Sequence, residues 1–139
     1  MQCVAWGTFQ SREPALSGEV AERLSAGVCY LATIRADGHP RVHPVGVNVR
    51  GDQLIVPMMP SSPKGHDLRR TGRFAVHCTV ENKLGEVEVL VSGLAQECDA
   101  AEEFRSRGWI TFDLGIGEVL IVTNDGSGAR VTRWRAETV

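Results

Sequence analysis

The stretch that decides the fold is LATIRADGHPRVHPVGV, residues 31–47. Apolar and β-branched residues flank the pair Asp37-Gly38, and an Asp-Gly pair between two such runs predicts a β-hairpin. We expect the two strands of this hairpin over residues 28–36 and 41–50. Pro44 has no N–H to donate, so we expect the second strand to lie at a sheet edge or to bulge there.

The same pattern continues along the chain. Five more strands are expected, over residues 53–59, 73–80, 86–96, 118–124 and 129–134, with tight turns that include 82–85 and 125–128. Three short helices are expected, over residues 17–26, 61–70 and from Asp99 to about Arg107. Ser17 and Ser62 are the expected N-caps of the first two, and Asp99 and Glu102 have capping-box spacing. The pattern predicts one mainly β domain over residues 1–139, whose antiparallel sheet closes into a barrel because closure removes exposed edges.

Composition excludes several classes of protein. The chain of 139 residues is 42% hydrophobic and has a formal net charge of −2, which argues against disorder and against a general nucleic-acid binder. No run approaches the ~20 apolar residues of a membrane helix, and the N-terminus lacks the pattern of a signal peptide. The four cysteines, at positions 3, 29, 78 and 98, form no CxxC pair. We therefore expect no structural metal, reduced thiols and a cytoplasmic location.

The segment with the most chemical content is SSPK, residues 61–64. A helix N-terminus carries unpaired N–H groups and a partial positive charge, which together attract anions. If Ser62 caps the helix, the hydroxyls of Ser61 and Ser62 and the ammonium group of Lys64 would add to a phosphate site. The alternative is that Ser62 only caps the helix and Lys64 is solvated.

Three segments in order make the chain similar to a known family. They are LATIRADGHPRVHPVGV (31–47), SSPKGHDLRR (61–70) and EVLVSGLAQ (88–96). Their order and spacing resemble the flavin-binding split β-barrel family that includes pyridoxamine 5′-phosphate oxidase. The resemblance implies a six-stranded antiparallel split β-barrel of Greek-key type. It also implies a homodimer with FMN in each of two grooves at the interface.

The resemblance also implies a set of cofactor-binding residues. The second strand would line the flavin with Arg41, Val42, His43, Pro44 and Val45, and the next long strand would add Pro57 and Met58. Ser61, Ser62 and Lys64 would hold the phosphate, and Glu88 would lie near the ring. An aromatic or basic residue of the partner subunit would close the groove, and the candidates are Trp109, Arg133 and Trp134, of which Trp134 is counted with the site.

The chain departs from genuine pyridoxamine 5′-phosphate oxidases at its C-terminus. Its last residues, RVTRWRAETV, carry no recognisable version of the basic motif that binds the substrate phosphate in those enzymes. The expected function is therefore a flavin-dependent oxidoreductase acting on another small molecule. The alternatives are an F420-dependent reductase, a non-enzymatic flavin or haem module, and a structural dimer with a vacant groove.

The remaining polar residues are ambiguous. His43 either contacts the cofactor or packs against its neighbours, while His39 belongs to a turn and His66 is expected in solvent. His77 lies in an apolar strand and is expected in the core, and Glu86 and Glu88 are expected on a solvated face. No catalytic acid or base is assigned, because a bound flavin would carry the chemistry.

Overall fold

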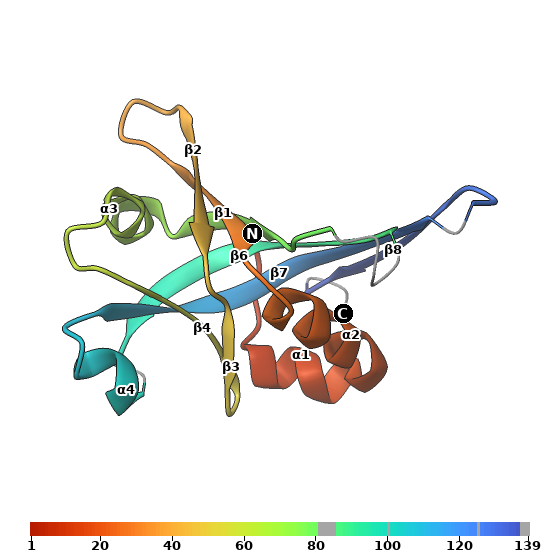
Figure 1. Ribbon diagram of the computed structural model, residues 1–139, viewed down its shortest axis with the longest axis horizontal. Helices are drawn as coiled ribbons and strands as arrows, with labels where there is room; N and C mark the ends of the chain where they lie inside the picture. Colours follow the sequence, from red (N-terminus) through yellow and green to blue (C-terminus); the bar gives the residue numbers. More distant parts are fainter. Residues whose placement is uncertain (81–85, 100, 125, 137–139) are drawn as a thin grey trace.

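A single curled antiparallel sheet forms the body of the protein (Figure 1). The computed structural model describes residues 1–80, 86–99, 101–124 and 126–136. Within these residues the strand order is β2-β1-β5-β6-β7-β4-β3, and β8 pairs with β7 beside this path. The strands are β1 (Cys29–Ile34), β2 (Pro40–Val45), β3 (Asn48–Arg50), β4 (Gln53–Met58), β5 (Arg73–His77), β6 (Glu86–Cys98), β7 (Ile110–Asn124) and β8 (Ala129–Arg135).

The hairpin predicted around Asp37-Gly38 is present, and it pairs β1 with β2 in the register Leu31↔His43. Pro44 lies on β2, which is an edge strand, as its missing N–H requires. The expected strand over residues 41–50 is wrong in one respect, because it divides into two. After Val45 the chain leaves β1, and β3 pairs with β4 instead. The sheet thus has eight strands rather than six, and it curls until β2 contacts β4.

The two longest strands, β6 and β7, pair side by side, and a cluster of glycines lies at a bulge between them. Their register shifts between Ser92 and Gly93, opposite residues 116–118. A Cβ on Gly93 would lie 1.9 Å from the carbonyl oxygen of Gly115, so only glycine allows this approach. The predicted strand over 118–124 is too short, because β7 begins at Ile110. Gly115 and Gly117 made the first half of β7 look unlike a strand in the sequence, but the close approach of β6 and β7 at the bulge requires them.

In the described part of the chain, four helices accompany the sheet: α1 (Trp6–Arg12), α2 (Pro14–Ser25), α3 (Pro63–Thr71) and α4 (Glu102–Arg105). The sequence did not predict α1. Ser17 does not cap α2, because Pro14 takes the first helical position and the Ser17 hydroxyl donates to the Pro14 carbonyl. Likewise, Ala101 and not Asp99 precedes α4. The prediction for α3 is confirmed, with Ser62 as its N-cap residue.

The core lies between the sheet and the helices α1 and α2, which pack beneath the long β6–β7–β8 ribbon (Figure 1). Trp6, Phe9, Val20 and Leu24 of these helices are fully buried. Cys29 and Cys78 are buried among them, as expected of small apolar side chains. In the described part of the chain, no helix is long and apolar enough to cross a membrane. The turn expected at 82–85 and Asp125 of the turn at 125–128 lie outside the described residues.

Candidate functional site

The start of α3 brings together two of the predicted phosphate-binding side chains. Ser62 precedes the helix with extended backbone angles, and its side chain is only 7% exposed. Its hydroxyl makes no capping bond and instead accepts a hydrogen bond of 3.0 Å from the Lys64 ammonium. Ser61, one residue earlier, is exposed. Ser62 and Lys64 thus form a polar cradle at the N-terminal end of a nine-residue helix, preceded by the exposed Ser61.

Lys64 is electrostatically unusual at this position. Burial lowers the pKa of its ammonium group from the ordinary value. No carboxylate among the described residues forms an ion pair with it. The N–H groups of Gly65 and His66 already donate to the Ser62 carbonyl oxygen. A partly desolvated cation at a helix N-terminus, where the partial positive charge of the helix adds to its own, is still a favourable place for an anion.

The side chains of β2 alternate between two faces of the sheet. Arg41, His43 and Val45 point toward the interior, whereas Val42 and Pro44 are exposed. The five residues predicted to line the flavin are therefore divided, because successive side chains of a strand point in opposite directions. A ligand lying on the outer face of β2 would contact Val42, Pro44 and the strand's backbone edge.

Arg41 is held by an acidic residue that the sequence analysis did not single out. Asp67 of α3 is only 2% exposed and accepts hydrogen bonds from Arg41 Nε at 2.8 Å and Thr33 Oγ1 at 2.7 Å. Its other oxygen accepts from Arg70 Nη2 at 2.9 Å. Burial would raise the pKa of the Asp67 carboxyl, but these donors hold it below the ordinary value. The i,i+3 spacing of Asp67 and Arg70 is visible in the sequence, but the contacts with Thr33 and Arg41 are tertiary.

The end of β4 packs against the first turn of α3. Met58 is 4% exposed, and its sulfur lies against Gly65 in the first turn of α3. Pro57 is partly buried and lies beyond Ile55, the last residue of β4 in the described pairing with β3. Met58 therefore positions α3 by packing. Pro57 lies in the part of β4 that still pairs with β7 but no longer pairs with β3.

Glu88 and Trp134 lie away from α3. Gly72 at the end of α3 meets β6 at Ala95, and Glu88 lies seven residues earlier, roughly 23 Å along the strand. Trp134 packs on Phe9 of α1 with ring centroids 4.7 Å apart, so it faces the interior. Trp109 stacks on Phe104 beside α4. Within one chain, the structure does not bring these residues to the cradle.

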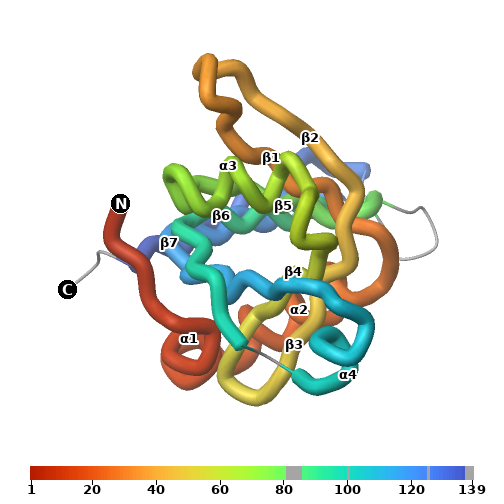
Figure 2. The backbone as a smooth tube through the Cα atoms, turned by 90° about the vertical axis from the view of Figure 1, so that its left-hand side faces the viewer, coloured from red at the N-terminus to blue at the C-terminus, as the bar shows by residue number. Residues whose placement is uncertain are grey.

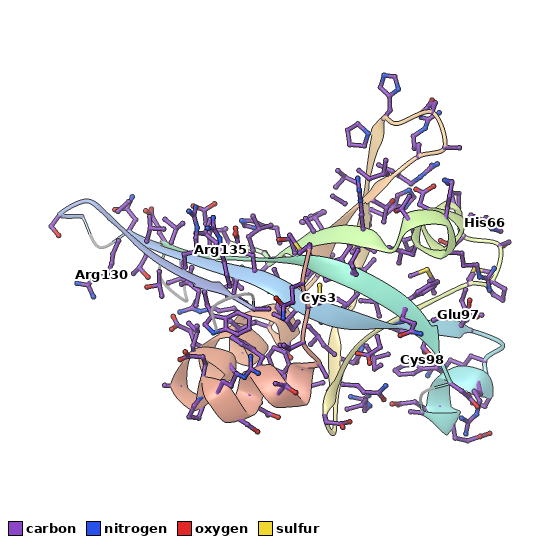
Figure 3. All side chains as sticks on the ribbon, turned by 180° about the vertical axis from the view of Figure 1, so that it is seen from behind. Cys3, His66, Glu97, Cys98, Arg130 and Arg135 are labelled. Carbon is purple, nitrogen blue, oxygen red and sulfur yellow. The ribbon has the colours of Figure 1, made fainter. Side chains whose placement is uncertain are left out.

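The outer face of the sheet, opposite α1 and α2, is a second feature of the molecule. The registers place Pro44, Tyr30, His77, Leu90, Leu120 and Arg133 in one row across β2, β1, β5, β6, β7 and β8. Tyr30 is 48% exposed, and Val42 in the neighbouring row is 63% exposed. Figure 3 shows Arg130 and Arg135 along β8, far from His66 on α3. We call the face of the sheet that carries this row of residues, from Pro44 to Arg133, the outer sheet face.

His77 lies on the outer sheet face and not in the core, which corrects the expectation from its apolar strand. Its Nδ1 lies 2.6 Å from the carbonyl oxygen of Cys78, and its Nε2 lies 3.3 Å from Glu88 Oε1. Alternation along β5 buries Phe74 and Val76 and turns His77 outward. In the part of the chain that the structure describes, no three His, Cys, Asp or Glu side chains are placed to hold a metal ion.

The fold defines a class of small proteins built on a curled antiparallel sheet, here with a polar cradle at the start of α3. A family model for pyridoxamine 5′-phosphate oxidase matches residues 16–135. The chain belongs to this family. No curated protein matches the sequence significantly.

Solved structures share the fold at low sequence identity. A haem-binding protein from Mycobacterium smegmatis is 18% identical with a TM-score of 0.65, over 84% of this chain and 57% of that one. The chain thus spans little more than half of that protein's length. PhzG from Burkholderia lata, solved with tetrahydrophenazine-1-carboxylic acid, is 16% identical with a TM-score of 0.56, over 92% and 91% of the two chains. A Clostridium acetobutylicum protein of the pyridoxinephosphate oxidase family is 7% identical with a TM-score of 0.62, over 94% and 96%.

Proposed function

We propose that this protein is a flavin-dependent oxidoreductase that binds FMN. The observation that carries the proposal is Lys64, a partly desolvated ammonium group that is bonded to Ser62 and has no carboxylate partner among the described residues. A phosphate at the start of α3 would supply the missing negative charge. Membership of the family supports flavin as the source of that phosphate.

The residues present fit an FMN molecule in outline. Ser61, Ser62 and Lys64 would hold the phosphate, and Val42 and Pro44 would contact the flavin from the exposed face of β2. Arg41, tied to Asp67, would hold β2 against α3 so that both halves of the site keep their spacing. Bound FMN would supply hydride or electron transfer to a small organic acceptor.

Titration of the purified protein with FMN tests this proposal. Lys64→Ala should weaken FMN binding by about 1.5–3 kcal/mol, roughly 10- to 150-fold, the scale of a charge-assisted hydrogen bond. Arg69→Gln is the matched control, because Arg69 lies on the same helix but pairs with Glu97. A wild-type protein that neither carries nor gains a chromophore near 450 nm would overturn the proposal.

The same cradle would accept the deazaflavin F420, which also presents a phosphate after a ribityl-like chain. Mass spectrometry of the ligand that co-purifies distinguishes the two cofactors. Reduction of the bound cofactor by a nicotinamide donor, or turnover with reduced F420, separates an enzyme from a non-enzymatic carrier. A bound cofactor that no donor reduces would favour the carrier.

We further propose that two copies of the chain pair through the outer sheet face. Tyr30, Val42 and Val131 expose apolar area on it, and a second copy would remove this area from water. Glu88 on β6 and Arg133 on β8 lie on the same face, so acidic and basic side chains could meet across a two-fold axis. Pairing would also bring Glu88 or Arg133 of the second copy toward the cofactor, which one chain alone does not do.

A second candidate function is haem binding, and His77 is the observation that favours it. When Nδ1–H donates to the Cys78 carbonyl and the Glu88 carboxylate, 3.3 Å from Nε2, turns aside, Nε2 offers a lone pair on the exposed side, an arrangement typical of metal-ligating histidines. The similar Mycobacterium smegmatis protein is a haem-binding protein. Haem titration with His77→Ala and His43→Ala tests this candidate. Loss of the Soret shift only in His77→Ala would support it, and an unchanged spectrum in His77→Ala would contradict it.

A further inference from the structure

A cavity lined by charged side chains lies between the β1–β2 hairpin and α3. The hairpin stands above the helix in both views (Figures 1 and 2). The cavity beneath it has a volume of about 340 Å³ and is lined by Arg35, Asp37, Arg41, His66, Asp67 and Arg70, among others. Of the cradle segment only Pro63 lines it; Ser62 and Lys64 do not. We call it the hairpin cavity.

The hairpin cavity carries an excess of positive charge. Three guanidinium groups, from Arg35, Arg41 and Arg70, face two carboxylates. Arg35 pairs with Asp37 at 3.2 Å, whereas Arg41 and Arg70 share the single carboxylate of Asp67. One positive charge is therefore uncompensated, before any contribution from His66.

The Asp67 carboxylate holds the guanidinium groups of Arg41 and Arg70 in place, and some of their N–H donors remain unused. Arg41 uses only Nε to reach Asp67, and neither Nη1 nor Nη2 meets an acceptor among the described residues. Arg70 uses both Nη atoms on Asp67 Oδ1, which fixes the plane of its guanidinium group. Asp67 is itself 2% exposed and fixed by Thr33, so it anchors both arginines. A planar fork of free N–H groups held by a buried carboxylate matches the two oxygens of a carboxylate or phosphate.

We propose that the hairpin cavity binds the oxyanion group of a small acid, either a carboxylate or a phosphate, separately from the phosphate cradle at Ser62 and Lys64. The cavity is large enough for a small organic acid. This proposal does not depend on a flavin, because Arg41, Arg70 and Asp67 are assembled by the chain itself.

An NMR titration of the full-length protein tests the site directly. The Nε–H signals of the arginines are followed while inorganic phosphate, and separately acetate, replaces chloride at constant ionic strength. The Arg41 and Arg70 signals should shift and saturate, whereas that of Arg69, which is paired with Glu97 on the other side of α3, should not. Shifts that stay linear, or equal shifts at Arg69, would overturn the proposal.

Variants and competition complete the test. Arg70→Gln should weaken phosphate binding at least about tenfold, and Arg69→Gln should leave it unchanged within about twofold. If Arg70→Gln does not fold, Arg35→Gln serves instead, because its ion pair is exposed and little stability depends on it. Wild-type affinity in the variant that folds would refute the site. Phosphate should still bind when FMN is present in excess, and competitive displacement by FMN would show that the cavity belongs to the flavin site.

Discussion

Asp67 on α3 accepts a hydrogen bond of 2.8 Å from Nε of Arg41 on β2, and this contact joins the helix that begins with the phosphate cradle to the strand expected to carry the flavin. Neither residue belongs to the cradle, yet their contact sets the distance between α3 and β2. Thr33 on β1 completes the link at 2.7 Å. The candidate site therefore includes a buried ion pair as well as the segment proposed to bind phosphate.

Asp67→Asn should destabilise the protein by about 2–3 kcal/mol. Removing one partner of a buried ion pair costs about 3–5 kcal/mol, and the partial exposure of Arg41 and Arg70 reduces this value. Urea denaturation measures the loss. Asp37→Asn is the control, because the exposed Arg35–Asp37 pair should contribute no more than about 1 kcal/mol. Equal effects of the two substitutions would contradict the role given to Asp67.

The ion pair also predicts how stability depends on pH. The folded-state pKa of Asp67 lies below its unfolded value of about 3.9. Its contribution is therefore fully present above pH ~4 and is lost as the pH falls through the folded pKa. Thermal denaturation between pH 2 and 6 should show a steeper acid loss in the wild type than in Asp67→Asn. Parallel curves would argue against a charged Asp67.

Val42→Arg should prevent the proposed pairing of two chains. Val42 is 63% exposed on the outer sheet face, and a guanidinium group there would have to be buried without a partner. Sedimentation velocity should change from a dimer to a monomer, with the fold retained by circular dichroism. Gln10→Arg, at an exposed position on α1, should remain dimeric. A wild-type protein that sediments as a monomer would contradict the pairing itself.

Two glycines should respond to alanine in opposite ways. Gly93→Ala places a Cβ 1.9 Å from the Gly115 carbonyl oxygen, so β6 and β7 must separate at the bulge and we expect little folded protein. Gly18→Ala on α2 meets no atom within 4 Å and should stabilise the protein by about 0.5–1 kcal/mol through helix propensity. Thermal unfolding of the soluble fraction measures both. A stable Gly93→Ala protein would contradict the close approach.

Elements with local signals were predictable from the sequence. The Asp37-Gly38 hairpin depends on a turn, the edge position of Pro44 on a missing N–H, and the start of α3 on Pro63, which suits the first helical position. Elements without such signals were not predictable. Helix α1 follows Ala5, whose side chain cannot cap, and the start of β7 was obscured by Gly115 and Gly117. Both elements are stabilised by packing that joins distant parts of the chain.

The sequence by itself determined the class of fold, the family and a candidate anion-binding cradle, because hairpins, caps and an ordered set of segments act over short distances. Only the tertiary structure decided which side chains share a face. It placed Arg41 and His43 on the inner face of β2, and Val42 and Pro44 on the outer face. It also packed Trp134 against Phe9 and placed His77 on the outer sheet face. It also brought Asp67 to Thr33 and Arg41. The physical reason is that strand pairing and helix docking set these contacts. Asp67 is 34 positions from Thr33 and 26 positions from Arg41, and the local sequence carries no information about contacts at that separation.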